Sequence, residues 1–368
     1  MTAATQISPS SRFYGLSRWS VLAPLVALGA VLLGKPEGVA LSLFVGLLLG
    51  AAIMAAVYHA EVLAHYLGEP FGTLVLALAV TIIESSLIVS IMLSEGAQAQ
   101  ALARDTLIAA IMITINGIIG ICLLAGGRRH HEQSYTQSGV SAGLAMLATL
   151  SVLTLILPNY TTSAGGAFYS PQQLVFVAIV SLLIYATFVV AQTIRHRDHF
   201  LHHIPDADDH AHEAPVPRAK AMAAAAAMLV ALVAVVLLAK NLSPTIEAGV
   251  AAIGAPRALV GIIIAALVLA PEGFAALRAA RANRVQTSLN LAIGSALATI
   301  GLTIPAVATV ALALGLDLEL GLSMPSIVIL ALTLLVAAIT LGRGRTTVVQ
   351  GVIHLTIFAT FLFITIVP

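Results

Sequence analysis

Two glutamates lie near the middle of long apolar stretches, where an ionised carboxylate is costly. Glu84 lies in TLVLALAVTIIESSLIVSIML (residues 73–93), which contains no basic residue, glycine or proline, and Glu272 lies in ALVLAPEGFA. An ionised acid at the centre of a membrane-spanning helix costs about 3 kcal/mol on insertion scales, and such residues usually serve a function. No Lys or Arg lies at a matching depth to pair with them. We therefore expect both glutamates to be functional side chains.

Two carboxylates that face each other in a low-dielectric interior can bind either protons or a cation. Burial and mutual repulsion favour the protonated form when no cation is bound, and the pair titrates as a coupled unit. A cation displaces the protons, because one carboxylate oxygen cannot bind both. If the empty, charged site cannot reorient across the membrane, cations move one way and protons the other. The residues thus predict proton-coupled cation exchange at Glu84 and Glu272.

A cation such as Ca²⁺ needs more oxygens than two glutamates provide. It takes six to eight oxygen ligands, at about 2.3–2.6 Å, and two carboxylates supply at most four. Pro271 directly precedes Glu272 and predicts a disrupted helix with a free carbonyl oxygen. Hydroxyl and amide side chains on the same or the following apolar stretch are further candidate ligands: Thr81, Thr114, Asn116, Ser288 and Ser295. Close helix packing is the alternative explanation for small hydroxyl residues.

The composition predicts a polytopic membrane protein and excludes several other classes. The chain is 60% hydrophobic and 9% charged, whereas soluble domains contain about 25% charged residues. The single cysteine excludes a disulfide or a thiolate zinc site within the chain. No phosphate-binding G-x-x-x-x-G-K-[ST] motif is present, which excludes ATP-driven transport of that type. We expect no nucleic-acid partner, no cofactor and no enzymatic activity, since a paired nucleophile or two-metal set is also missing.

Apolar stretches of about 20 residues predict an all-α integral membrane protein with eleven transmembrane helices. They lie near residues 18–34, 37–66, 72–94, 104–127, 136–157, 171–195, 219–240, 250–280, 285–316, 323–341 and 347–367. The first follows basic residues as a signal peptide would, but it lacks a convincing cleavage site. We therefore interpret it as a retained helix.

The distribution of basic residues supports this number of helices. With a cytoplasmic N-terminus, 13 of the 17 Lys and Arg residues fall on the cytoplasmic side, and four fall on the opposite side. This bias follows the positive-inside rule and places the C-terminus on the opposite side. The expected location is a bacterial inner membrane, with membrane lipid as a partner, while nothing indicates an oligomer.

The chain divides into two similar halves after a short first segment. Residues 1–36 form an N-terminal tail and first helix, and residues 37–195 and 219–368 each contain five predicted helices and one midspan glutamate. In each half a helix rich in small and hydroxyl residues follows the glutamate helix. A gapless alignment matches Thr114 with Ser295, and Ser295 belongs to a stripe at helical spacing with Ser288, Ala292, Thr299 and Thr303. An odd number of helices per repeat predicts two inverted copies, as in secondary transporters.

The segment between the halves, residues 196–218, has a different composition. It is rich in histidine and aspartate, and it falls on the predicted cytoplasmic side. Histidines become charged near pH 6.5, so the segment is either a metal sensor or proton buffer, or a disordered polar linker.

Two stretches resemble a known group of transporters. HAEVLAHYLGEPFGTLVLALAVTIIE (59–84) and PEGFAALRAARANRVQTSLNLAIGSALATIGLTIP (271–305) are similar to the two repeat regions of the cation/calcium exchanger superfamily, especially its bacterial calcium/proton antiporter branch. The resemblance implies that Glu84 and Glu272 bind cation and proton alternately, and that Ser295 belongs to the G-S pair of the family. Many members read G-N-A-[TV]-E where this chain reads VTIIE and LAPEG.

We therefore expect a secondary cation/proton antiporter that exports Ca²⁺ in exchange for H⁺ by alternating access. One alternative is Na⁺ or K⁺ exchange for H⁺, which requires neutralising the charge of only one carboxylate. The other is a cation channel lined by the two glutamates, which would show currents far above the turnover of a carrier.

Overall fold

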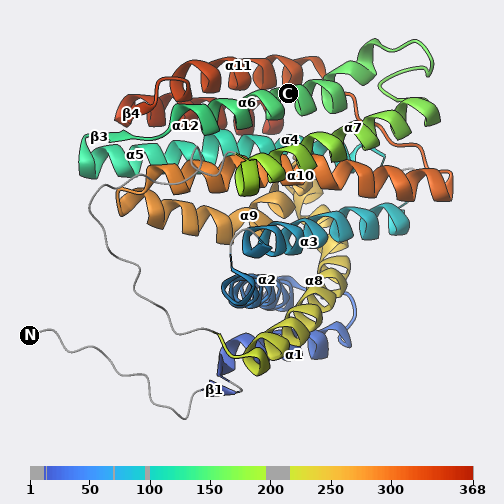
Figure 1. Ribbon diagram of the computed structural model, residues 1–368. Helices are drawn as coiled ribbons and strands as arrows, with labels where there is room; N and C mark the ends of the chain where they lie inside the picture. The colour runs from blue at the N-terminus through green and yellow to red at the C-terminus, as the bar shows by residue number, and fades with distance from the viewer. Residues whose placement is uncertain (1–11, 14, 69–70, 96–99, 196–215, 368) are drawn as a thin grey trace, which may run out of the picture. The chain divides into compact units, whose positions relative to one another are not determined.

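The computed structural model describes residues 12–13, 15–68, 71–95, 100–195 and 216–367, and the chain forms two compact units (Figure 1). The first unit comprises residues 1–83 and 207–245, and the second comprises residues 84–206 and 246–368. Of the predicted His/Asp-rich linker, residues 196–215 lie outside the described residues.

The first unit is a small bundle of apolar helices. It contains β1 (Arg12–Phe13), β2 (Leu16–Ser17), α1 (Arg18–Val31), α2 (Val39–Leu67), the beginning of α3 (Phe71–Glu95) and most of α8 (Arg218–Ala252). α1 packs along α2. Leu16, Val62 and Ala224 form a buried cluster that joins β2, α2 and α8.

The second unit contains the remaining elements and most of the buried polar side chains. These elements are α4 (Leu102–Ile111), η3 (Met112–Ile118), α5 (Ile119–His130), β3 (Glu132–Ser134), α6 (Gln137–Ser151), η4 (Val152–Ile156), η5 (Leu157–Tyr160), α7 (Pro171–Val190), η6 (Ala191–Arg195), α9 (Ala258–Arg281), α10 (Val285–Leu314), α11 (Met324–Leu341), β4 (Arg345–Thr347) and α12 (Val348–Ile366). The segments η3, η4 and η6 are π-helical, and η5 is a 3₁₀ turn.

The continuous helix α4–η3–α5 lies at the centre of the second unit. It is the most enclosed of the long apolar helices in the described part of the chain. Many of its large apolar side chains are fully buried, namely Leu107, Ile111, Met112, Ile115, Ile119 and Leu123. α9 packs against α4 and α5, α12 packs against α5, and α10 packs against α6, α7 and α9 (Figure 1).

The helices agree with the predicted all-α membrane architecture. Among the described residues, nine helices are long and apolar enough to cross a membrane, and two shorter apolar helices, Arg18–Val31 and Leu78–Leu93, complete the series. These eleven helices coincide with the eleven predicted stretches. One predicted boundary is wrong: the seventh stretch continues through Lys240 and Pro244 to Ala252, so that α9 begins only at Ala258.

The helix is not interrupted at Pro271, where the sequence predicted a disrupted backbone and a free carbonyl oxygen. α9 is helical from Ala258 to Arg281, with Pro271 inside it. A membrane helix tolerates proline where neighbouring groups and small local adjustments satisfy the freed backbone carbonyl. The irregular stretch lies instead on the adjacent helix, at the π-helical segment Met112–Ile118, which the sequence analysis did not foresee.

Contacts at the helix ends join segments that the charge distribution places on the same side. β3 pairs antiparallel with β4, and His130 Nε2 lies 3.0 Å from the Arg281 carbonyl oxygen. At the opposite helix ends, the Glu319 N–H donates to the Gln100 carbonyl at 3.1 Å, and Phe168 forms a bridge with Glu319.

Candidate cation site

Glu272 lies inside the second unit, where α9 packs against α10. Its side chain is buried, and its Oε2 accepts a hydrogen bond from the Ser295 hydroxyl of α10. Ser295 is itself buried. The carboxyl group therefore has a defined position between the two helices, and a hydroxyl oxygen lies directly beside it.

Glu84 is the more deeply buried of the two glutamates, with 1% of its surface exposed. Its Oε2 accepts a hydrogen bond of 2.8 Å from the Thr299 hydroxyl. Its other oxygen, Oε1, is buried and has no hydrogen-bond partner among the described residues. A buried carboxylate oxygen without a donor is costly, so this atom is available to a proton or a cation.

Both glutamates contact the same face of α10, one helical turn apart. Ser295 and Thr299 are separated by four residues, which places them about 6 Å apart along the helix axis. Each hydroxyl binds one carboxyl group. The structure therefore brings the two predicted glutamates together, although they are 188 positions apart in the sequence.

Thr299 was not among the predicted ligands, but it directly contacts one of the carboxylates. Its signal in the sequence was the stripe of small and hydroxyl residues at helical spacing on α10. Thr303, the next hydroxyl of that stripe, lies 3.2 Å from the Ser85 hydroxyl, next to Glu84. Two hydroxyls of the stripe, those of Ser295 and Thr299, bind the carboxylates. Another, that of Thr303, contacts α3 at Ser85.

Helical spacing from Ile118 and Cys122 places Thr114 on the side of its helix that packs against α9. Ile118 is four residues further along, and a Cβ atom on Gly273 would lie 3.3 Å from its Cδ1. Cys122, after four more residues, packs against Ala276. The Thr114 hydroxyl donates to the Ala110 carbonyl at 2.7 Å, so it is near the level of Glu272 but bonded within its own helix.

The Asn116 amide bonds to side chains of α11 and α12. Its Nδ2 donates to Thr333 Oγ1 at 2.8 Å, and its Oδ1 lies 3.0 Å from His354 Nδ1. These partners are on α11 and α12, whereas Thr114 faces α9. The structure thus separates two residues that the sequence analysis grouped as ligands, and it gives the Asn116 amide other partners.

The two remaining predicted ligands, Thr81 and Ser288, differ in their position along the helices relative to Glu84 and Ser295. Thr81 is buried on α3, one turn before Glu84. Ser288 is buried two turns before Ser295, about 10 Å along α10. The Ser288 hydroxyl lies near the Cys122 thiol, although no hydrogen bond of ordinary geometry joins them.

No group of three His, Cys, Asp or Glu side chains that could hold a metal ion occurs within the described ranges. A transported cation at Glu84 and Glu272 would therefore complete its coordination with hydroxyl groups, backbone carbonyls or water, as hard cations do.

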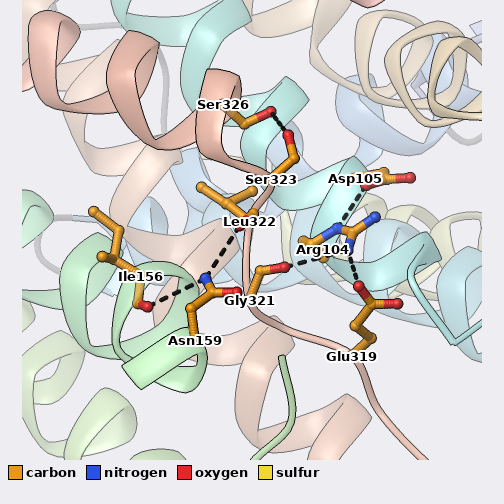
Figure 2. Close-up of polar contacts among 9 residues, drawn as sticks. All are labelled: Arg104, Asp105, Ile156, Asn159, Glu319, Gly321, Leu322, Ser323 and Ser326. Atoms are coloured by element: carbon orange, nitrogen blue, oxygen red, sulfur yellow. Dashed lines mark hydrogen bonds and ion pairs between the residues drawn. The ribbon is translucent and has the colours of Figure 1, made fainter. Parts of the chain in front are cut away.

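A second cluster of charged residues lies at one end of the second unit (Figure 2). Arg104 Nε donates to Asp105 Oδ1 at 2.8 Å, and its Nη1 donates to Glu319 and, at 3.2 Å, to the Gly321 carbonyl. The three charged side chains are 17%, 19% and 29% exposed, in the order Arg104, Asp105, Glu319. This cluster links the start of α4 to the segment between α10 and α11, and its acids already have a cationic partner.

We expect Arg104→Gln to lower the free energy of unfolding by about 1–3 kcal/mol, because two half-buried carboxylates lose their cation. Partial exposure keeps the loss below that of a fully buried pair. Arg345→Gln is the control, since Arg345 is 75% exposed and pairs with Glu132 at 3.2 Å; its loss should stay below about 1 kcal/mol. Thermal unfolding in detergent measures both, and equal losses would contradict a structural role for the Arg104 cluster.

A mainly helical membrane protein with two carboxylates buried between its helices has the features of an ion-transporting membrane protein. The sequence places it more narrowly. The chain belongs to the sodium/calcium exchanger protein family, whose pattern it matches over residues 38–194 and 223–367. This result confirms the predicted superfamily.

Two relatives align with nearly the whole chain. The chain is 47% identical to y4hA of Sinorhizobium fredii over 356 residues, which cover 95% of this chain and 96% of that protein. It is 35% identical to the sodium-potassium/proton antiporter ChaA of Escherichia coli over 350 residues, which cover 93% and 94%. The fold is similar to the crystal structure of the H⁺/Ca²⁺ exchanger CAX, with a TM-score of 0.67, 15% identity, and coverage of 94% of this chain and 89% of that one.

Proposed function

We propose that the protein is a secondary cation/proton antiporter in which Glu84 and Glu272 bind cations and protons alternately. The observation that carries the proposal is the contact of both buried carboxylates with successive turns of α10. One carboxylate oxygen, Glu84 Oε1, has no partner among the described residues. Ser295 and Thr299 are the additional cation ligands, because each hydroxyl oxygen can turn a lone pair towards a cation that replaces the proton.

Ca²⁺ is the cation we propose, since two carboxylates balance two positive charges. Exchange of Na⁺ or K⁺ is the second candidate, and the name of the E. coli relative, a sodium-potassium/proton antiporter, favours it. For either cation, Thr81 and Thr114 can contribute further oxygens, because Thr81 is one turn before Glu84 and Thr114 is near the level of Glu272. The Asn116 amide is bonded to α11 and α12, and Ser288 lies two turns from Ser295, so we rank these two predicted ligands below Thr81 and Thr114.

We further propose that the chain comprises one N-terminal helix and two inverted five-helix repeats, residues 37–195 and 219–368. Inversion requires the glutamate helix of one repeat to run parallel to the helix that follows the glutamate helix in the other. In support, a Cβ on Gly261 would lie 3.2 Å from the backbone of Asp105, and one on Gly273 would lie 3.3 Å from Ile118, so α9 runs parallel to α4–α5.

The contacts at the site are also consistent with two equivalent halves. When Thr114 is aligned with Ser295, Ile118 occupies the position equivalent to Thr299. Thr299 binds Glu84 of the other half, and Ile118 lies against the residue after Glu272. We place the protein in a bacterial inner membrane with its N-terminus in the cytoplasm, on the charge distribution given above.

Everted membrane vesicles provide the test. A pH gradient is formed by respiration in vesicles from a host without its own exchangers, and Ca²⁺, Na⁺ or K⁺ is then added while a pH-sensitive dye is followed. We expect Ca²⁺ to collapse the gradient in vesicles that contain the protein and not in vesicles from an empty-vector strain. The proposal fails if none of the three cations does so, and currents far above carrier turnover would indicate a channel.

The pH dependence of the half-saturating concentration distinguishes the two kinds of cation. Protons and cations compete for the same carboxylates, so apparent affinity should rise with pH. A divalent cation that displaces two protons gives up to about a hundredfold change per pH unit, and a monovalent cation that displaces one gives about tenfold. A pH-independent affinity would exclude competition at the carboxylates.

A further inference from the structure

A buried polar network lies on the side of the central helix away from the carboxylates. His354 of α12 has 0% of its surface exposed. Its Nδ1 lies 3.0 Å from Asn116 Oδ1, and its Nε2 lies 2.9 Å from Thr340 Oγ1 of α11. Asn116 Nδ2 donates to Thr333 Oγ1, also of α11, at 2.8 Å. The network therefore joins η3, α11 and α12 through side-chain hydrogen bonds.

His354 Nδ1 is a hydrogen-bond donor in this network. An amide oxygen only accepts, so His354 Nδ1 must bear the hydrogen that it donates to Asn116. In the neutral imidazole, Nε2 then has a lone pair that faces the Thr340 hydroxyl, whose one hydrogen is shared between Nε2 at 2.9 Å and the Val336 carbonyl oxygen at 2.7 Å. The Asn116 amide nitrogen has two hydrogens, one for Thr333 and one for Met112 Sδ at 3.3 Å. An uncharged His354 is compatible with these contacts, and a hydrocarbon interior favours the uncharged form.

Asn116 is the link between this network and the cation site. It lies within the π-helical segment Met112–Ile118, where each turn contains about one residue more than in an α-helix. On the opposite side of the segment, Ile118 packs beside Gly273 of α9, and helical spacing places Thr114 on the same side. His354 therefore bonds to one side of the π-helical segment, and the other side packs against the stretch of α9 that contains Glu272.

We propose that His354 is a positioning residue for cation binding. The hydrogen bond from His354 to Asn116 fixes the position of the π-helical segment Met112–Ile118. That segment holds Thr114 and Ile118 against the part of α9 that contains Glu272. His354 contacts neither carboxylate in this arrangement, so it acts through the position of other residues. The proposal rests on the proposed function, because cation affinity is one of its readouts.

Two substitutions separate the hydrogen bond from mere packing. His354→Leu removes both nitrogens, while His354→Asn retains an N–H group near the position of Nδ1. In vesicle exchange, we expect His354→Leu to raise the half-saturating cation concentration at least about fivefold, a typical coupling between linked sites. The rate at saturating cation should change less than about twofold, since the carboxylates are intact. His354→Asn should remain close to the unsubstituted protein.

Thr356→Val is the matched control on the same helix. Thr356 is exposed, and its hydroxyl donates to the Val352 carbonyl at 2.9 Å. We expect no change in cation affinity or maximal rate. Equal affinity for the Leu variant and the unsubstituted protein, or equal losses for the Leu and Asn variants, would overturn the proposal.

Hydrogen–deuterium exchange gives a readout that does not depend on transport. In the purified full chain in detergent, backbone amides of residues 112–118 should exchange at least about tenfold faster in His354→Leu, because local opening becomes easier. They should exchange at the normal rate in His354→Asn. Unchanged exchange in the Leu variant overturns the positioning role even if the protein proves not to be an antiporter. Faster exchange with normal cation affinity shows that the network holds the turn but not the site, which overturns the proposal too.

Discussion

Glu272→Gln is expected to abolish cation-dependent proton flux in everted vesicles, and Glu84→Gln is expected to do the same. Glutamine has the size of glutamate, and its amide oxygen can still accept the hydrogen bond from Ser295 or Thr299. It has neither the charge that binds a cation nor the proton that is exchanged for it. The loss should be at least about a hundredfold, or roughly 3 kcal/mol, the order found when one member of a buried charge pair is removed.

The control for this prediction makes the same substitution at a surface glutamate. Glu132 of β3 is 50% exposed and pairs with Arg345, so Glu132→Gln should leave exchange unchanged. Purified Glu84→Gln and Glu272→Gln should also unfold at or above the temperature of the unsubstituted protein, because each removes a buried ionisable group. Exchange at the normal rate in either site variant would exclude that glutamate from the mechanism.

The sequence was most informative about which residues lie in the membrane and which of them are unusual. Long apolar stretches located the eleven helices, because a bilayer sets the length of a spanning helix. Glu84 and Glu272 could be selected because an acid at midspan is rare and costly. The hydroxyl stripe on α10 also followed from helical spacing, and it includes Thr299, which binds Glu84.

The sequence was less informative about which neighbour covers each side of a helix. Thr114 and Asn116 are two positions apart and therefore point in nearly opposite directions, one towards α9 and the other towards α11 and α12. Nothing local in the sequence says which side faces the carboxylates. The role of His354 was missed for the same reason, since a single histidine in an apolar stretch has no visible partner until Asn116 is placed beside it.

Local rules about proline also failed in this environment. Pro271 predicted a break, yet α9 is continuous, while the π-helical segment Met112–Ile118 contains no proline at all. Helix geometry inside a membrane depends on how neighbouring helices satisfy and crowd the backbone. Packing of this kind depends on where glycines let two helix backbones approach closely.

Gly351→Ala is expected to disrupt the packing of α12 on the central helix. A Cβ atom at position 351 would lie 2.5 Å from the backbone nitrogen of Leu124 and 2.9 Å from the carbonyl oxygen of Gly120. These are backbone atoms, so no side-chain rotation relieves the clash, and α12 must move away from α5. Overpacking of a well-packed interior costs about 1–3 kcal/mol, occasionally more. We expect the upper end, because the displaced helix also contains His354, three residues further along.

The measurement is the folded yield and the midpoint of thermal unfolding of the purified protein in detergent. Gly351→Ala should lower the midpoint by about 4 °C or more and reduce the yield. Gly29→Ala is the matched control, since Gly29 also lies within a membrane helix, α1, and an added Cβ meets nothing within 4 Å. Alanine favours a helix over glycine by about 1 kcal/mol, so the control should unfold at the same temperature or slightly higher. If Gly351→Ala behaves like Gly29→Ala, the close approach of α12 and α5 at Gly351 is not required for the fold.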